Sequence, residues 1–245
     1  MDKLKTMEEY WDIRSDGFSK GVLDELNEKH DYWKEKMSGL LKDAPEGRVL
    51  DIGCGPGIFT IILSELGYEV TAFDFSSEML AEAKKNAESY GVKAEFMQGD
   101  AQNLPFEDGS FAVVVSRNLT WNLEQPERAY REWLRVLKPG GIIINCDGNH
   151  YSHYYREEYR LEREQPEYKD GHNPEYLKNI DVSIIDDIAR ELPLSKELRP
   201  TWDINFLINE GVGYAGAEIM RKEFTDAEGI KHSIIKNFIL KAQRA

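Results

Sequence analysis

A glycine-rich segment that follows a short apolar run limits the possible folds of this chain more than any other feature. Residues 49–57 read Val-Leu-Asp-Ile-Gly-Cys-Gly-Pro-Gly, and an apolar helical pattern begins at Ile58. Glycines at the junction of a strand and a helix let the backbone turn sharply and approach a ligand closely. Parallel sheets bind ligands at the carboxyl ends of their strands. The segment fits an ordinary strand-to-helix turn or a ligand-binding loop, and the residues that follow it decide between the two.

Short β-branched runs alternate with longer helical patterns through the first two thirds of the chain. Ser76 and Ser77 offer an N-cap for one connecting helix. Pro126 can begin another helix, which Gly140 and Gly141 are expected to end. Strands that alternate with helices predict a parallel sheet with helices on both faces. The predicted strands lie at 48–52, 69–74, 94–97, 111–116 and 142–146.

Two further β patterns, at 216–224 and 233–241, flank a turn at 226–229. This spacing predicts an antiparallel hairpin with a loop of four or five residues. A hairpin added to five parallel strands predicts an α/β fold. The expected architecture is a doubly wound, Rossmann-like, seven-stranded sheet, mostly parallel with an antiparallel last strand, and with helices on both faces.

The charge balance narrows the range of partners. The chain has 245 residues with 31 basic and 45 acidic side chains, which gives a formal net charge of −14. An acidic chain repels nucleic-acid phosphates and anionic lipid headgroups, so neither nucleic acid nor membrane is expected as a partner. The two cysteines, Cys54 and Cys146, fit no metal-binding spacing and suit a reducing compartment. Residues 1–14 lack the apolar core of a signal peptide and the apolar runs are short, which predicts a cytoplasmic protein.

An aspartate at the end of the second predicted strand indicates what the glycine loop binds. Asp74 lies seventeen residues after Gly57, where a carboxylate can accept hydrogen bonds from both hydroxyls of a ribose. The loop and the acid together predict a nucleoside ligand. The dinucleotide fingerprint Gly-x-Gly-x-x-Gly fails in both registers, because Ile58 or Thr60 stands where the third glycine belongs. A nicotinamide oxidoreductase is therefore disfavoured.

Over roughly residues 48–147, the sequence resembles class I S-adenosylmethionine-dependent methyltransferases, in the branch that includes the ubiquinone/menaquinone-biosynthesis type. The loop at 49–57 is similar to motif I of that family, and the Gly-Asp-Ala triplet at 99–101 to the motif after the third strand. The Leu-Pro-Phe triplet at 104–106 and the Leu-Lys-Pro-Gly-Gly turn at 137–141 are similar to the same branch. The family's last strand runs antiparallel, in agreement with the predicted hairpin.

The resemblance implies that S-adenosylmethionine is the cofactor and S-adenosylhomocysteine the product. It implies that Asp51 and the glycine loop hold the methionine end, that Asp74 binds the ribose and that Asp100 accepts from the adenine amino group. Similar methyltransferases fold an N-terminal helix over the methionine end, which would bring in Tyr10 and Arg14; packing of this helix on the core is the alternative. The implied cofactor-binding residues are Tyr10, Arg14, Asp51, Gly53, Cys54, Gly55, Gly57, Asp74, Phe75, Asp100, Ala101 and Ser116.

The end of the fourth predicted strand, residues 116–122, is where this fold presents its acceptor. The segment lacks the Pro-Pro-aromatic motif of DNA and protein amide methylases. Ser116 and Asn118 supply no pair of acids for magnesium, so no metal is expected. His150 and His153 follow the fifth strand and are the candidate general bases, with exposed loop histidines as the alternative. Unless they serve the core or a charged surface, the residues expected to line the acceptor pocket are Arg117, Asn118, Trp121, Tyr154, Arg199 and Trp202.

The sequence therefore predicts a methyltransferase that acts on a small molecule by in-line methyl transfer. The alternatives are a transferase that uses a modified adenosylmethionine and a non-catalytic S-adenosylmethionine-binding protein. The oligomeric state and the methylated atom do not follow from these residues. The predicted division of the chain is an N-terminal helical lid at 1–44, a cofactor-binding core at 45–148, an acceptor-pocket insertion at 149–205 and a hairpin at 206–245 that completes the sheet.

Overall fold

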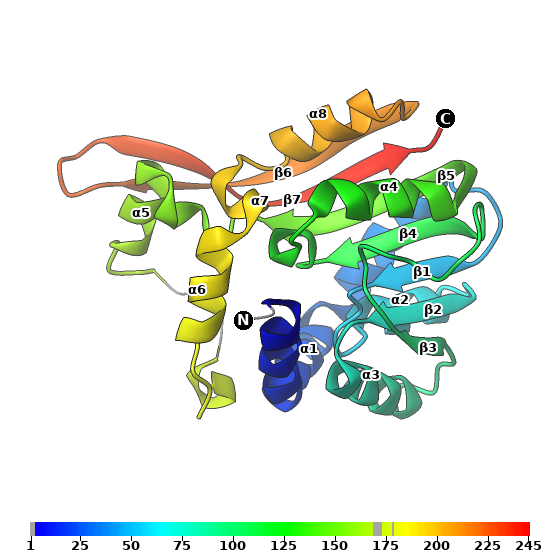
Figure 1. Cartoon of the computed structure of the whole chain (residues 1–245). Coiled ribbons are helices and arrows are strands. Elements are labelled where there is room, and N and C mark those ends of the chain that lie inside the picture. The colour runs from blue at the N-terminus through cyan, green and yellow to red at the C-terminus, as the bar shows by residue number, and fades with distance from the viewer. Residues whose placement is uncertain (1–2, 169–172, 178) are drawn as a thin grey trace.

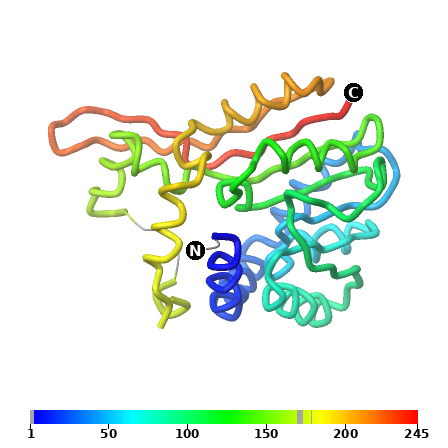
Figure 2. Tube along the Cα trace, viewed as in Figure 1, coloured from blue at the N-terminus to red at the C-terminus, as the bar shows by residue number. Residues whose placement is uncertain are grey.

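The computed structural model describes residues 3–168, 173–177 and 179–245. Within these ranges the strands form one seven-stranded sheet in the order β3-β2-β1-β4-β5-β7-β6 (Figures 1 and 2). The first five strands are parallel, and β7 runs antiparallel to both of its neighbours. This arrangement confirms the predicted fold. The strands are β1 Val49–Ile52, β2 Val70–Asp74, β3 Glu95–Gln98, β4 Phe111–Arg117, β5 Leu137–Gly148, β6 Tyr214–Thr225 and β7 Lys231–Gln243.

Helices cover both faces of the sheet, because β1 and nearly all of β4 are buried and most of their side chains are apolar. On one face, Met37 and Phe59 pack against the strands. On the other face, Trp133 and Leu207 form the core. Figure 1 shows α4 and α8 together on one side and α1, α2 and α3 on the other. These helices are α1 Lys3–Leu41, α2 Ile58–Glu65, α3 Ser77–Ser89, α4 Pro126–Val136 and α8 Thr201–Asn209.

Local signals in the sequence place two of these elements correctly. Ser76 caps α3, because its Oγ accepts a hydrogen bond from the backbone N–H of Met79 at 3.0 Å. The turn of the β6–β7 hairpin is organised by Asp226, whose Oδ1 accepts from the backbone N–H groups of Glu228 at 3.0 Å and Ile230 at 2.8 Å. Both strands of the hairpin extend further than the sequence patterns predicted.

The prediction that Gly140 and Gly141 end a helix is wrong. Helix α4 ends at Val136, and β5 begins at Leu137, whose backbone is already extended at φ −74° and ψ 143°. Both glycines therefore lie inside β5. A Cβ on Gly141 would lie 3.0 Å from the carbonyl oxygen of Ala112 on β4. The glycine is needed for close contact between two strands, where the pairing of β4 and β5 also shifts register.

The segment between β5 and β6 is mostly helical, and α8 crosses the boundary predicted at residue 205. Helix α8 begins at Thr201, directly after Pro200. Its Leu207 packs in the core before the chain enters the hairpin. No helix in the described part of the chain is both long and apolar enough to span a bilayer. The short helix η1 Thr120–Asn122 follows β4. The remaining helices described between β5 and α8 are η2 Ser152–Tyr154, α5 Glu157–Arg163, η3 Pro174–Leu177, α6 Ser183–Glu191 and α7 Pro193–Lys196.

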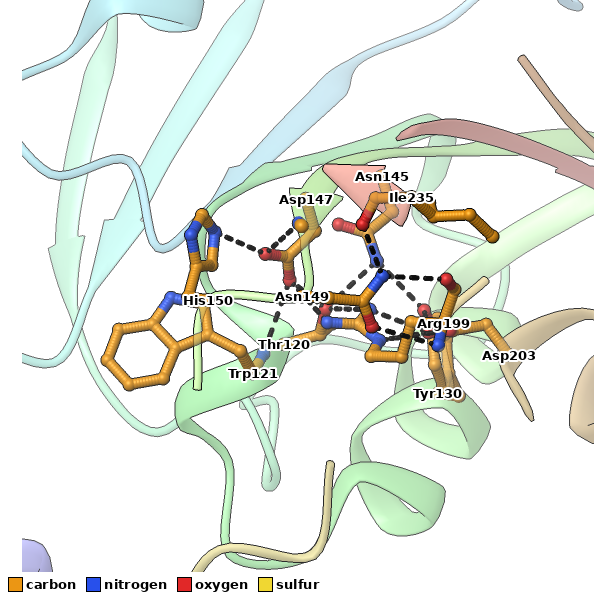
Figure 3. A network of polar contacts seen from close by, with 11 residues as sticks. Thr120, Trp121, Tyr130, Asn145, Asp147, Asn149, His150, Arg199, Asp203 and Ile235 are labelled. Atoms are coloured by element: carbon orange, nitrogen blue, oxygen red, sulfur yellow. Dashed lines mark hydrogen bonds and ion pairs between the residues drawn. The ribbon is translucent and has the colours of Figure 1, made fainter. Parts of the chain in front are cut away.

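A buried ionic network ties this insertion to the sheet (Figure 3). The Arg199 guanidinium donates from Nη1 to Asp147 Oδ2 at 2.8 Å and from Nε to Asp203 Oδ2 at 2.9 Å. Tyr130 donates to Asp203 Oδ1 at 2.7 Å, and Asn145 donates to the Tyr130 hydroxyl at 2.9 Å. All five side chains are buried. Because two carboxylates share one guanidinium, each partner depends on the others to remain ionised out of contact with water.

Replacing Arg199 by methionine tests this dependence. R199M leaves Asp147 and Asp203 buried without their cation, and we expect the free energy of unfolding to fall by about 3–5 kcal/mol. Urea denaturation followed by circular dichroism measures the loss. R160M is the matched control, because Arg160 forms exposed ion pairs with Glu157 and Glu164. An equal loss in both variants contradicts a structural role for the network.

Candidate functional site

A cavity of about 460 Å³ lies where the carboxyl ends of β1, β2 and β4 meet the first half of α1. The strand order reverses between β1 and β4, which is the position where doubly wound sheets bind ligands. The volume falls in the range of small-molecule sites. Its walls come from the loops after the first four strands, from α1 and from η3.

The glycine loop after β1 forms the floor of the cavity. Gly53 and Gly55 have φ angles of 63° and 50°, which favour glycine. A Cβ on Gly53 would lie 2.7 Å from Leu119 Cδ2. The backbone N–H groups of Gly53 and Cys54 both donate to the carbonyl oxygen of Phe73 on β2, at 2.7 and 3.2 Å. The loop is therefore fixed to the neighbouring strand, with Gly55 facing the cavity and Gly57 preceding α2.

Asp74 closes the other side of this loop. Its Oδ2 accepts from the backbone N–H of Gly55 at 2.8 Å, and its Oδ1 accepts from the backbone N–H of Ser76 at 2.9 Å. Burial raises the pKa of Asp74 to about 6 despite these hydrogen bonds. Each carboxylate oxygen retains a further acceptor position, so the side chain can receive two hydroxyl groups from a ligand in the cavity.

Asp51 is the second acid in the cavity wall. It lies in β1, and Thr60 of α2 donates to its Oδ2 at 2.6 Å. Burial, with a contribution from nearby Asp74, raises the pKa of Asp51 to about 7. A buried carboxyl group with this pKa is poised to ionise when a cation approaches.

The loop after β3 contributes the third acid. Asp100 Oδ1 accepts from the backbone N–H and the side-chain amide of Gln102, at 2.8 and 3.0 Å. Trp133 of α4 donates to the carbonyl oxygen of Ala101 at 3.0 Å and so fixes the backbone of this loop. Phe75 lies across the cavity in the loop after β2. The three predicted residues Phe75, Asp100 and Ala101 therefore line one cavity.

The first half of α1 covers the cavity. Asp12 accepts from the hydroxyl of Ser76 at 2.5 Å, and Ser19 accepts from Asn86 of α3 at 3.0 Å. Arg14 lines the cavity, but it is buried and donates to the carbonyl oxygen of Tyr176 at 3.0 Å. These contacts join α1 to α3 on one side of the cavity and to η3 on the other.

Tyr10 does not line the cavity. It packs in an apolar cluster with Met7, Trp121, Ile185 and Ile188. Burial raises the pKa of its hydroxyl. Tyr10 therefore joins α1 to α6, while the neighbouring Trp11 reaches the cavity wall.

At the end of β4, Arg117 and Asn118 line the cavity, and Ser116 is buried behind them. Arg117 Nη2 donates to both carboxylate oxygens of Glu25 on α1, at 2.9 and 2.7 Å. Burial disfavours the ionised form of Glu25, but Arg117 and Trp33 outweigh it and hold the pKa of Glu25 below its usual value. The charge of Arg117 is thus largely neutralised within the protein.

Both histidine candidates lie outside the cavity lining. His150 Nε2 lies 3.3 Å from Asp147 Oδ1, and its ring packs on Trp121 (Figure 3). His153 accepts from Arg163, and burial together with that cation lowers its pKa to about 4.

The remaining acceptor-pocket predictions also lie elsewhere. Arg199 is fully buried in the ionic network, so it cannot face a ligand in the cavity. Trp202 stacks on Phe206 beside a separate, shallower cavity. Trp121 belongs to the α1–α6 cluster, and Tyr154 lies beneath Arg190.

Several residues of the cavity wall were not predicted, and many of them lie on α1. Phe18, Val22 and Glu25 face the cavity together with Arg14. Their spacing of three or four residues is the pattern of one helix face, which could have identified them. Tyr176 gives no comparable signal, because its position depends on the fold of the insertion.

A doubly wound sheet with a glycine loop and three acids around one cavity defines a nucleoside-binding α/β protein. Residues 50–145 match the protein family described as a methyltransferase domain. This part of the chain is therefore similar to methyltransferase domains, and the predicted resemblance to class I S-adenosylmethionine-dependent methyltransferases is confirmed for it.

Curated relatives carry a more specific name. The chain is 36% identical over 114 residues to demethylmenaquinone methyltransferase of Thermus thermophilus, which is 46% of this chain and 52% of that protein. It is 37% identical over 126 residues to the enzyme of the same name from Lactococcus lactis, which is 50% of each chain. The chain thus matches about half the length of these relatives.

Solved structures agree on the fold. A SAM-dependent methyltransferase from Aquifex aeolicus superposes with a TM-score of 0.54 at 18% identity, over 86% of this chain and 89% of that one. The PH0226 protein from Pyrococcus horikoshii superposes with a TM-score of 0.55 at 20% identity, over 90% and 92% of the two chains. These similarities extend beyond residues 50–145 and show the fold of most of the chain.

Proposed function

We propose that this protein transfers the methyl group of S-adenosylmethionine to a small-molecule acceptor. The observation that carries the proposal is the set of three acids, Asp51, Asp74 and Asp100, around a glycine loop in one cavity. A nucleoside with a cationic amino-acid arm requires hydroxyl acceptors and a counter-ion in this arrangement. The methyltransferase domain match at residues 50–145 supports the same assignment.

The proposed cofactor contacts follow from these positions. Asp74 receives the two ribose hydroxyls, Asp51 faces the ammonium group of the methionine end, and Asp100 with Ala101 faces the adenine. Gly55 permits close approach of the ligand, because a Cβ placed there would point into the cavity, 3.5 Å from the nearest atom of Phe18. The Arg14 guanidinium has donors beyond the one that Tyr176 receives, and one of them can bind the cofactor carboxylate.

The protein's part in the reaction is to position the reactants and exclude water. The cofactor supplies an electrophilic methyl group on a sulfonium, which an acceptor attacks in line. Trp11 and Phe18 on α1 place aromatic faces at the cavity, where they can stabilise a cation and keep water out. His150 is a better general-base candidate than His153, because Asp147 orients its ring. An acceptor would have to extend past Trp121 to reach it.

For the acceptor we propose a hydroxylated aromatic ring of the quinol class. Two observations support this choice: the relatives are named demethylmenaquinone methyltransferases, and Trp11, Phe18 and Phe59 line the cavity. The Arg117–Glu25 pair leaves the end of β4 nearly neutral, which suits an uncharged ring. Transfer of another group from a modified adenosylmethionine, and binding without catalysis, are the competing functions.

Asp74→Ala provides the first test. With a reduced demethylated naphthoquinone as acceptor, the wild-type protein should form S-adenosylhomocysteine. Loss of the paired ribose contacts should raise KM for S-adenosylmethionine roughly tenfold or more, with a much smaller change in kcat. D43A is the control, because Asp43 is exposed and remote from the cavity. Binding of S-adenosylmethionine without turnover of any acceptor would favour the non-catalytic alternative.

The two raised pKa values predict that cofactor binding releases protons. Asp51 and Asp74 have pKa values of about 7 and about 6 in the free protein, and both must be ionised to bind an ammonium group and hydroxyls. The affinity should therefore fall as the pH decreases through 7 and then 6. Calorimetry at pH 6.5 in buffers of different ionisation enthalpy measures the protons released. D51N should release fewer protons when S-adenosylmethionine binds. Proton uptake by the wild-type protein would contradict the assignment of Asp51 and Asp74 to the cofactor.

A further inference from the structure

A cluster of four cations lies in the insertion and the hairpin, outside the cofactor cavity. Arg163 ends α5, Arg190 is in the last turn of α6, and Lys222 and Lys236 lie on β6 and β7. Figure 1 shows α5 beside the outer half of this hairpin. We call these four residues the basic cluster. In a chain with a net charge of −14, a concentration of positive charge in one place calls for an explanation.

Aromatic rings hold the basic cluster together. The Tyr168 ring has Arg163, Lys222 and Lys236 at 5.4, 5.8 and 5.2 Å from its centroid. Arg190 lies over the Tyr154 ring at 4.3 Å. A guanidinium stacked on a ring uses its face, so its N–H donors remain available in the plane. Both arginines are thus held beside a ring, and this contact does not use their N–H donors.

The basic cluster is only partly neutralised. Glu162 is buried and receives Lys222 at 2.8 Å and Lys236 at 2.9 Å. Among the residues that the structure describes, neither Arg163 nor Arg190 forms an ion pair with a carboxylate. Within the described ranges, the carboxylate that pairs with the basic cluster is Glu162, and it pairs with the two lysines and with neither arginine.

The pKa of His153 is affected by the positive charge of the basic cluster. Arg163 Nη1 lies 3.1 Å from its Nδ1, and its ring is 4.0 Å from that of Tyr154. Burial lowers the pKa of His153, and Arg163, Arg190 and Lys236 lower it further, to about 4. The imidazole is therefore neutral at pH 7 and accepts from Arg163 instead of adding a fifth charge.

We propose that the basic cluster binds a phosphate-class oxyanion carried by a small molecule, with Arg163 and Arg190 as its main donors. Arginine forks match the oxygens of a phosphate group in pairs. A bilayer is a less suitable source of phosphate, because the adjacent hairpin turn carries Asp226 and Glu228, which anionic lipids repel. This site is separate from the cofactor cavity and goes beyond the proposed methyl transfer.

The test follows the ring signals of ¹³C-labelled histidine by NMR during titration with inorganic phosphate at constant ionic strength. H153Q identifies the His153 signal. We expect a saturable shift of that signal with phosphate and none with chloride, and a higher pKa for His153 when phosphate is bound. R190Q, and the double variant R163Q/R190Q, should weaken phosphate binding roughly tenfold or more.

R131Q is the matched control, because Arg131 also lies over a ring, that of Phe206, but is paired with Glu210. Its phosphate affinity should equal that of the wild-type protein. A response that does not saturate, or that chloride reproduces, overturns the proposal. So does binding of vesicles that contain an anionic phospholipid when inorganic phosphate does not bind. Calorimetry with S-adenosylmethionine should give the wild-type affinity for R190Q, so failure here is distinguishable from failure of the proposed methyl transfer.

Discussion

The hydrogen bond from the backbone N–H of Gly55 to Asp74 couples the loop after β1 to the end of β2. With the two N–H groups that donate to the Phe73 carbonyl, it fixes the glycine loop in a conformation that other residues adopt only with strain. A β-carbon on the loop would collide with the chain after β4 or narrow the cavity. The shape of the binding site therefore depends on contacts between neighbouring strands, which the parallel sheet brings together at one edge.

The charges of the cavity are balanced unevenly. At the end of β4, Arg117 and Glu25 neutralise each other. At the ends of β1 and β2, burial raises the cost of ionising both Asp51 and Asp74, and the charge of Asp74 raises it further for Asp51. Neither carboxylate forms an ion pair within the described part of the chain. A cationic ligand would relieve that cost. The protein thus leaves two carboxylates uncompensated where a cationic ligand is expected. It neutralises the charges where an uncharged acceptor is expected.

Most residues that the sequence predicts for cofactor binding line one cavity, whereas most of those predicted for the acceptor pocket lie elsewhere. Asp51 lies near the carboxyl end of β1, Asp74 ends β2, and Asp100 follows β3. Parallel strands end at one edge of the sheet, so the meeting of these three acids follows from local patterns. Arg199 looked like a pocket residue, yet it pairs with Asp147, 52 positions away. Arg117 pairs with Glu25, 92 positions away. Contacts of this kind depend on how α1 and the insertion pack against the sheet. The periodicity of the sequence does not specify that packing. Gly141 fails as a helix stop for the same reason, since its contact with Ala112 of β4 determines its place, and Gly140 lies beside it within β5.

Calorimetric titration with S-adenosylmethionine, S-adenosylhomocysteine and NADH tests the central claim most directly. The cavity and its three acids predict that both adenosyl compounds bind with dissociation constants on the order of micromolar, and that NADH does not bind. Binding of NADH without either adenosyl compound would contradict the assignment of this cavity and indicate an oxidoreductase.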